Sequence, residues 1–127
     1  MPLVTVTVRA GKPAAFKDAV LRGVHGALVA TGVPEADRFQ RVLELAAEDF
    51  RYDPRYPDAA SPRGEDFVLV EILWSVGRSA KVKRKTVTDI VTALRADPGV
   101  DPEHVMIVFK ETQWENWAFA GGRLLNA

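Results

Sequence analysis

An internal repeat constrains the fold of this chain more than any other feature of its sequence. Residues 11–17, which begin with a glycine and a cation, align with residues 77–83, and the Gly-Val pair at 32–33 aligns with the pair at 99–100. Each half therefore has the pattern strand, turn, amphipathic helix, Gly-Val stop, strand. A helix that connects two strands of one sheet implies that those strands are parallel. The repeat predicts two β-α-β units.

The local patterns place four strands and two helices in these units. Val4, Val6 and Val8 alternate with threonines in the first eight residues, as expected for a half-buried strand. Further strands are predicted at residues 39–45, 67–76 and 105–109. A first helix is expected between Pro13 and Gly32, and a second is expected to begin at the N-cap Ser79 and to end before residues 97–99. Two such units would form a four-stranded sheet with both helices on one face.

We therefore expect an α+β fold with an internal pseudo-twofold axis. One domain spans residues 1–127, with the repeats at about 2–47 and 67–110, a loop at 48–66 and an aromatic C-terminal segment at 111–127. Helices on one side leave the other face of the sheet open, and we assign the apolar residues around Trp74 to that open face. A homo-oligomer is the simplest cover. The loop either covers a functional site or is an exposed insertion, and the sequence favours neither.

Composition excludes several classes of function. The 127 residues include no cysteine, so disulfides, thiolate metal ligands and cysteine nucleophiles are excluded. Basic and acidic residues balance at 17 each, which gives no indication of a nucleic-acid or membrane partner. The two histidines, His25 and His104, are too few and too isolated for a zinc site, so we expect no metal and no cofactor. No leader-like segment or membrane-spanning run is apparent, and we expect a cytoplasmic protein.

Pro2 is the candidate catalytic residue that the sequence offers directly. If Met1 is removed, Pro2 becomes a free secondary amine at the start of a core strand. An α-amino group has a pKa of roughly 7.7–8, which desolvation or a nearby cation lowers. Such an amine could act as a general acid or base near neutral pH. Alternatively, Pro2 is only a strand start at which the missing N–H has no cost.

Four places in the chain resemble the tautomerase superfamily, and most closely its malonate semialdehyde decarboxylase branch. They are Pro2, the Asp-Arg-Phe-Gln run at residues 37–40, the Gly-Arg-Ser turn at 77–79, and the Trp-Ala-Phe run at 117–119 followed by the Gly-Arg pair at 122–123. The resemblance covers nearly the whole chain except residues 48–66. It implies β-α-β repeats, a catalytic N-terminal proline and assembly as a trimer.

The resemblance also implies roles for individual residues. Pro2 would be the acid/base, and Arg78 would bind the carboxylate of a keto acid and lower the pKa of the proline. Asp37 would assist a water molecule or polarise a carbonyl. Each has an alternative, since Arg78 could simply satisfy a carbonyl of the helix turn and Asp37 could cap a turn.

Three further residues complete the predicted site. Trp117 and Phe119 would form an apolar wall that lowers the local dielectric, although both could equally be ordinary core residues. His25 falls where a related dehalogenase has an active-site histidine, but on its helix it could also be a packed residue.

One difference limits how far the resemblance can be carried. The decarboxylase branch has an Arg-x-Arg pair, and here the first of the two positions is Val76. Lys12, the repeat partner of Arg78, could supply the second cation. The leading hypothesis is therefore keto–enol tautomerisation of small 2-oxo or 3-oxo acids such as phenylpyruvate. Malonate semialdehyde decarboxylation or hydration is one alternative, and a non-catalytic oligomeric protein is another.

Overall fold

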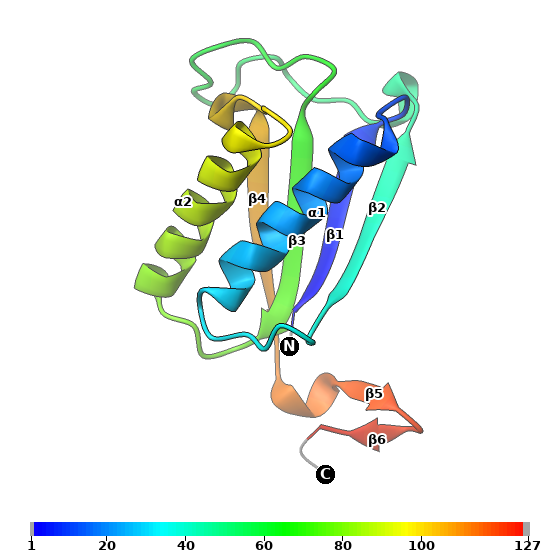
Figure 1. The fold of residues 1–127 in the computed structure, drawn as a ribbon, viewed down its shortest axis with the longest axis vertical. Helices are drawn as coiled ribbons and strands as arrows, with labels where there is room; N and C mark the ends of the chain where they lie inside the picture. The colour runs from blue at the N-terminus through cyan, green and yellow to red at the C-terminus, as the bar shows by residue number, and fades with distance from the viewer. Residues whose placement is uncertain (1, 126–127) are drawn as a thin grey trace.

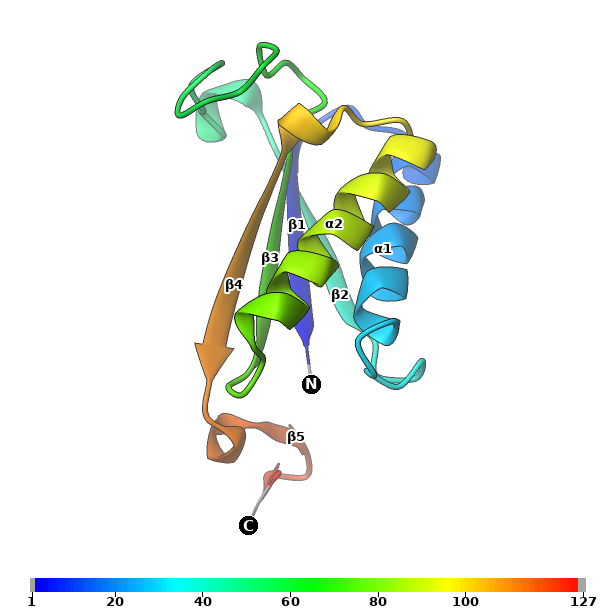
Figure 2. The same cartoon turned by 90° about the vertical axis from the view of Figure 1, so that its left-hand side faces the viewer.

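The computed structural model describes residues 2–125, which form a four-stranded sheet with two α-helices on one face (Figures 1 and 2). The sheet order is β2-β1-β3-β4. The elements are β1 (Leu3–Arg9), α1 (Ala14–Val29), β2 (Phe39–Leu45), β3 (Val68–Ser75), α2 (Ala80–Ala96) and β4 (Val105–Thr112).

The strand pairing confirms the two β-α-β units. β1 is parallel to β2, β3 is parallel to β4, and β1 and β3 are antiparallel at the centre of the sheet. The pseudo-twofold axis therefore passes between β1 and β3. In that central pair Leu3 lies opposite Leu73, so the start of β1 lies beside the end of β3.

Glycine occurs at the start of both repeated turns because the backbone there adopts a positive φ. Gly11 and Gly77 have φ of +106° and +118°, a region that strongly favours glycine, and each turns the chain from a strand toward its helix. Two residues after Gly77, Ser79 caps the N-terminus of α2. Its hydroxyl accepts a hydrogen bond from the backbone N–H of Val82 at 3.2 Å. The same short sequence pattern thus builds the same strand-to-helix corner twice.

The core lies between the helices and one face of the sheet. Side chains from the strands and from both helices are fully buried there, and each contributes roughly 1.5–3 kcal/mol relative to an exposed position. The most deeply buried members are Val4, Val6, Val8, Val20, Val24, Leu28, Val68, Val70, Ile72, Trp74, Ile90 and Leu94.

Trp74 lies in this core, and its assignment to the open face of the sheet was wrong. Its side chain is fully buried and stacks on Phe109, with ring centres 4.9 Å apart. The open face instead presents Leu3, Leu43 and Leu73 around a shallow cavity of about 180 Å³. Apolar residues alternate on both sides of β3, so periodicity alone could not say which side the helices cover.

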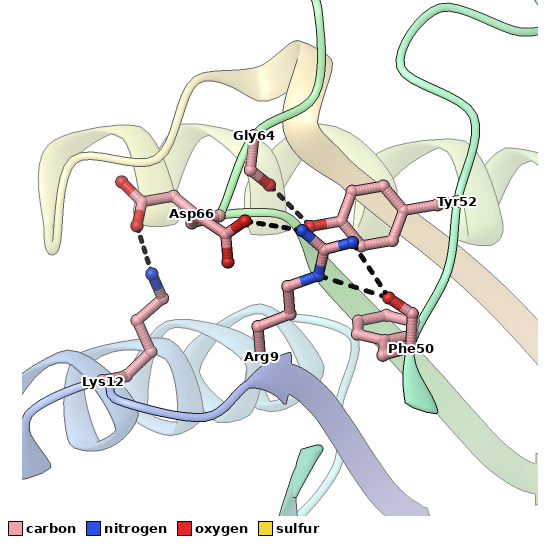
Figure 3. A network of polar contacts seen from close by, with 7 residues as sticks. Arg9, Lys12, Phe50, Tyr52, Gly64 and Asp66 are labelled. Atoms are coloured by element: carbon pink, nitrogen blue, oxygen red, sulfur yellow. Dashed lines mark hydrogen bonds and ion pairs between the residues drawn. The ribbon is translucent and has the colours of Figure 1, made fainter. Parts of the chain in front are cut away.

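The loop between β2 and β3 is attached to the end of the sheet where β1 finishes (Figure 3). Arg9 donates two hydrogen bonds to the backbone carbonyl of Phe50, both at 3.2 Å, and forms an ion pair with Glu65 at 2.6 Å. Tyr52 donates to the carbonyl of Gly64 at 2.6 Å. The seven residues of β1, which span about 20 Å, separate this loop from Pro2. Within one chain, therefore, the loop does not cover the Pro2 region.

The C-terminal segment, whose structure the sequence left open, forms a small hairpin. A short 3₁₀ helix, η3 (Trp114–Asn116), leads into β5 (Ala118–Ala120) and β6 (Arg123–Leu124), which pair antiparallel. The hairpin lies beyond the ends of β3 and β4, at the end of the sheet where β1 starts (Figure 1).

We expect the loop to loosen at acid pH. Backbone N–H groups of Tyr56 and Arg55 donate to the Asp53 carboxylate and lower its pKa. A lowered folded-state pKa contributes stability above the unfolded pKa of about 4, and this contribution is lost as pH falls through the folded value. Amide protection at Arg55 and Tyr56 should therefore decrease below about pH 4.

Two Asp53 variants make this expectation specific. Asp53→Ala should show low protection at every pH, and Asp53→Asn, which keeps a neutral acceptor, should show no acid transition. An acid transition that persists in Asp53→Asn would assign the effect to another group.

Candidate active site

One end of the sheet gathers most of the predicted site residues. The start of β1 brings Pro2 there, the turn between β3 and α2 brings Arg78, and the segment between α1 and β2 brings Asp37 (Figure 1). The C-terminal hairpin adds Trp117 and Phe119. These segments meet because β1 and β3 are antiparallel, which places the start of β1 beside the end of β3, with Leu3 opposite Leu73.

An apolar cavity of about 240 Å³ surrounds Pro2, which is itself buried. The rings of Trp117 and Phe119 are nearly parallel, with centres 5.4 Å apart. The ring of Phe39 contacts that of Phe119, with the two ring centres 5.6 Å apart. The two predicted wall residues therefore lie beside Pro2. The full lining is Pro2, Leu3, Phe39, Trp117, Ala118 and Phe119.

Phe39 is a member of this wall that the sequence reasoning missed. Phe39 lies opposite Leu3 in the parallel pairing of β1 and β2, and Leu3 is the residue that follows Pro2. The predicted parallel pairing places the starts of both strands at the same end of the sheet, which could have suggested Phe39, and the register of the structure sets it opposite Leu3.

A second cavity, of about 460 Å³, holds Arg78 and Asp37 together with Trp114. Arg78 donates from Nη1 to the carbonyl of Ser75 at 2.6 Å, and its guanidinium carbon lies 4.5 Å from the ring centre of Trp74. Burial lowers the pKa of Arg78, whereas the charges of Glu111 and Asp37 raise it. An arginine pKa starts so high that the side chain stays cationic at neutral pH.

Asp37 reaches this cavity through a tight turn, in which its backbone N–H donates to the carbonyl of Pro34 at 3.0 Å. Both of its carboxylate oxygens are buried, and its negative charge acts on Arg78. A buried carboxylate next to a guanidinium is a usual arrangement for general acid–base or electrostatic roles, and it also occurs in purely structural ion pairs.

Ser75 joins the two cavities. Its carbonyl accepts the hydrogen bond from Arg78, and its hydroxyl accepts one from Nε1 of Trp117 at 3.0 Å. The cation and the aromatic wall are thus tied to the same residue at the end of β3.

His25 lies apart from both cavities. Its side chain is buried on α1, and its Nε2 donates to the backbone carbonyl of Glu35 at 2.9 Å. This bond holds the segment that leads to Asp37. The structure therefore places His25 among packed residues. Its hydrogen-bond partner, Glu35, precedes the candidate site residue Asp37 by two positions.

Lys12 does not supply a second cation to this end of the chain. It lies in the turn after β1, at the opposite end of the sheet, and pairs with Asp66 (Figure 3). The expectation that it could complement Arg78 was wrong for a single chain, because the antiparallel pairing of β1 and β3 sends the two repeated turns to opposite ends. Val76, which departs from the Arg-x-Arg pattern of the decarboxylase branch, adds no charge.

The fold and the site define an α+β protein of two β-α-β repeats with a buried proline at one end of its sheet. A family model described as tautomerase enzyme matches residues 37–120, so the chain belongs to the tautomerase family. A probable tautomerase of Ralstonia nicotianae is 28% identical over 53 residues, which are 42% of this chain and 82% of that protein.

Solved structures extend the similarity over nearly the whole chain. A structure of malonate semialdehyde decarboxylase, described as having decarboxylase and hydratase activities, is 27% identical, with a TM-score of 0.87 over 95% of this chain and 92% of that one. A fused 4-OT, solved as a symmetric trimer, is 25% identical, with a TM-score of 0.79 over 98% and 97% of the two chains. The expected similarity to the decarboxylase branch is confirmed.

No helix among residues 2–125 is both long enough and apolar enough to cross a membrane.

Proposed function

We propose that this chain is an enzyme that interconverts the keto and enol forms of small 2-oxo or 3-oxo carboxylic acids such as phenylpyruvate. The observation that carries the proposal is the position of Pro2, buried against Trp117 and Phe119 at the end of the sheet that also holds Arg78. In this proposal the substrate carboxylate pairs with Arg78, and its apolar part lies on the aromatic wall.

The chemistry requires that Pro2 have a free amine, which exists only after removal of Met1. In the enol-to-keto direction, the amine removes the proton from the enol oxygen. It then delivers a proton to the double-bonded carbon next to the carbon that bears this oxygen. One O–H bond breaks, one C–H bond forms, and the enzyme is unchanged. Burial and the positive charge of Arg78 both disfavour the protonated amine, so both would move its pKa from about 8 toward neutrality.

The wall favours a substrate with an aromatic side chain. Offset or tilted aromatic contacts contribute about 0.5–1.5 kcal/mol beyond simple burial, and the parallel rings of Trp117 and Phe119 present such a surface. An apolar wall also strengthens the charge interactions near it.

The test compares two forms of the protein that differ only at the amine. Intact mass identifies chain that begins at Pro2, and a second preparation retains extra residues before Pro2 so that its nitrogen is an amide. We expect phenylpyruvate enol to be converted by the first form and not by the second. Equal rates would contradict the proposal, and a fully retained Met1 in the native protein would favour the non-catalytic alternative.

Malonate semialdehyde decarboxylation or hydration is the second candidate. It is supported by the 27% identity to a malonate semialdehyde decarboxylase and by Asp37, which shares a cavity with Arg78. The neutral Val76 and the remote Lys12 weigh against it, because a single cation binds and stabilises a developing anion less well than two. Release of carbon dioxide from malonate semialdehyde, lost in Asp37→Asn, would favour this function over tautomerisation.

We also propose that the chain assembles as a trimer. The open sheet face presents apolar residues, among them Leu43, 43% exposed, and a similar fused 4-OT is a symmetric trimer. Native mass spectrometry that found only the 14.0 kDa monomer would contradict this assembly.

A further inference from the structure

Ser75 is the residue that connects the two halves of the candidate site. It is the last residue of β3 and is fully buried. Its hydroxyl holds the indole N–H of Trp117, while its backbone carbonyl holds the guanidinium of Arg78. A single strand end thus positions both the apolar wall and the cation relative to Pro2.

The first repeat contains an equivalent anchor, made through a backbone carbonyl rather than a ring N–H, at the opposite end of the sheet. Arg9 is the last residue of β1, as Ser75 is of β3, and it donates two hydrogen bonds to the carbonyl of Phe50 (Figure 3). Phe50 follows the 3₁₀ helix η1 (Ala47–Asp49) just as Trp117 follows η3.

The aromatic partners also correspond between the two repeats. Tyr52 stands two residues after Phe50, as Phe119 stands two residues after Trp117, and both pairs are in ring contact. The structure therefore uses the end of the first strand of each repeat to anchor an aromatic-x-aromatic segment that follows the second strand. The anchor is a recurring part of the fold, and in the second repeat its aromatic segment lines the Pro2 cavity.

We propose that Ser75 is a positioning residue, whose hydroxyl orients Trp117 against Pro2. The proposal rests on the proposed function for its kinetic consequence, and on geometry alone for its structural one. Trp117 is only half-buried, and among residues 2–125 its ring has one aromatic stacking partner, Phe119, whose side chain is itself exposed. The hydrogen bond to Ser75 is therefore the contact that ties the indole to the main sheet. Without the acceptor on Ser75, the indole would no longer be held in one orientation.

The variant that tests this role is Ser75→Ala. It removes the acceptor for Trp117 but keeps the backbone carbonyl that binds Arg78, so the cation is left in place. A hydrogen bond of ordinary net strength corresponds to roughly a tenfold change, so kcat/KM for phenylpyruvate enol should fall about tenfold. The loss should lie mainly in KM, because the wall binds the substrate and does not transfer the proton.

A double-mutant cycle with Trp117→Phe makes the test specific. Phenylalanine has no N–H to donate, so adding Ser75→Ala to Trp117→Phe should change kcat/KM less than about twofold. Thr86→Val is the matched control, because it also removes a buried hydroxyl, and Thr86 lines neither cavity. Its hydroxyl bonds the backbone carbonyl of Val82, a residue that borders the Arg78 cavity, and the substitution leaves the Val82 side chain unchanged. It should leave kcat/KM unchanged.

A readout independent of activity is the indole N–H resonance of Trp117, identified as the one missing in Trp117→Phe. In Ser75→Ala this resonance should shift and exchange with solvent faster, and in Thr86→Val it should not. An unshifted resonance, or an effect of Ser75→Ala that is as large in the Trp117→Phe background as in the parent, would overturn the proposal. If the parent converts no enol, the proposed function fails, and the resonance still decides whether Ser75 positions Trp117.

Discussion

Replacing Pro2 with alanine should lower kcat/KM for phenylpyruvate enol by at least about 10²-fold, the lower range for removal of a positioned acid or base. Alanine leaves a primary amine after removal of Met1, so the group itself is retained. What is lost is the pyrrolidine ring. It fixes the direction of the nitrogen lone pair and lines the cavity beside Trp117 and Phe119. Steady-state ketonisation of phenylpyruvate enol measures the effect.

Pro13→Ala is the matched control for this prediction. Pro13 is the exposed N-cap residue of α1, it makes no side-chain cap hydrogen bond, and it lies at the far end of the sheet. This variant should keep the parental kcat/KM. If Pro2→Ala were as active as Pro13→Ala, with both variants folded by circular dichroism, a requirement for the pyrrolidine ring of Pro2 would be excluded, and the comparison of free and blocked amines would alone decide the acid/base role.

Replacing Arg78 with alanine should lower kcat/KM by about 10²–10³-fold, similar to the removal of one preorganised charge-stabilising donor. In the proposed function the guanidinium would both bind the substrate carboxylate and disfavour protonation of Pro2, so KM should rise and the acidic limb of the pH–rate profile should move to higher pH. Arg78→Lys should recover only part of the activity, because an ammonium cannot meet a carboxylate through two parallel hydrogen bonds.

The repeat supplies the control for Arg78. Lys12 occupies the equivalent turn in the first repeat, but its partner is Asp66 at the opposite end of the sheet. Lys12→Ala should leave kcat/KM unchanged, and because the Asp66 side chain is 68% exposed, stability should fall by no more than about 1 kcal/mol. A large kinetic effect of Lys12→Ala would place Lys12 in a site formed between chains.

Local features of the fold were predictable from the sequence. The strand at residues 39–45 coincides with β2, and Ser79 is the N-cap of α2, as its position after Gly77 indicated. These predictions succeeded because alternation, capping and positive-φ glycines depend on neighbouring residues only.

Features that depend on distant segments were not predictable in the same way. The side of the sheet on which Trp74 lies, the attachment of the 48–66 loop to Arg9, and the hairpin that carries Trp117 all require knowledge of which surfaces meet. Phe39 stood within the Asp-Arg-Phe-Gln run and Ser75 in no motif, and neither was predicted as a site residue, because each matters through residues that lie far from it in the chain.

The sequence by itself determined that this chain contains two β-α-β units, because each unit is encoded within its own repeat. Only the tertiary structure decided how the units join, since the pairing of β1 with β3 leaves no period or motif in the sequence. That antiparallel pairing sends the two equivalent turns to opposite ends of the sheet. Pro2, Arg78 and the anchored Trp117 therefore lie at one end, whereas Lys12 pairs with the acidic loop at the other. Two similar halves thereby acquire different surroundings, and of the two repeated turns it is the one with Arg78 that lies at the same end of the sheet as Pro2.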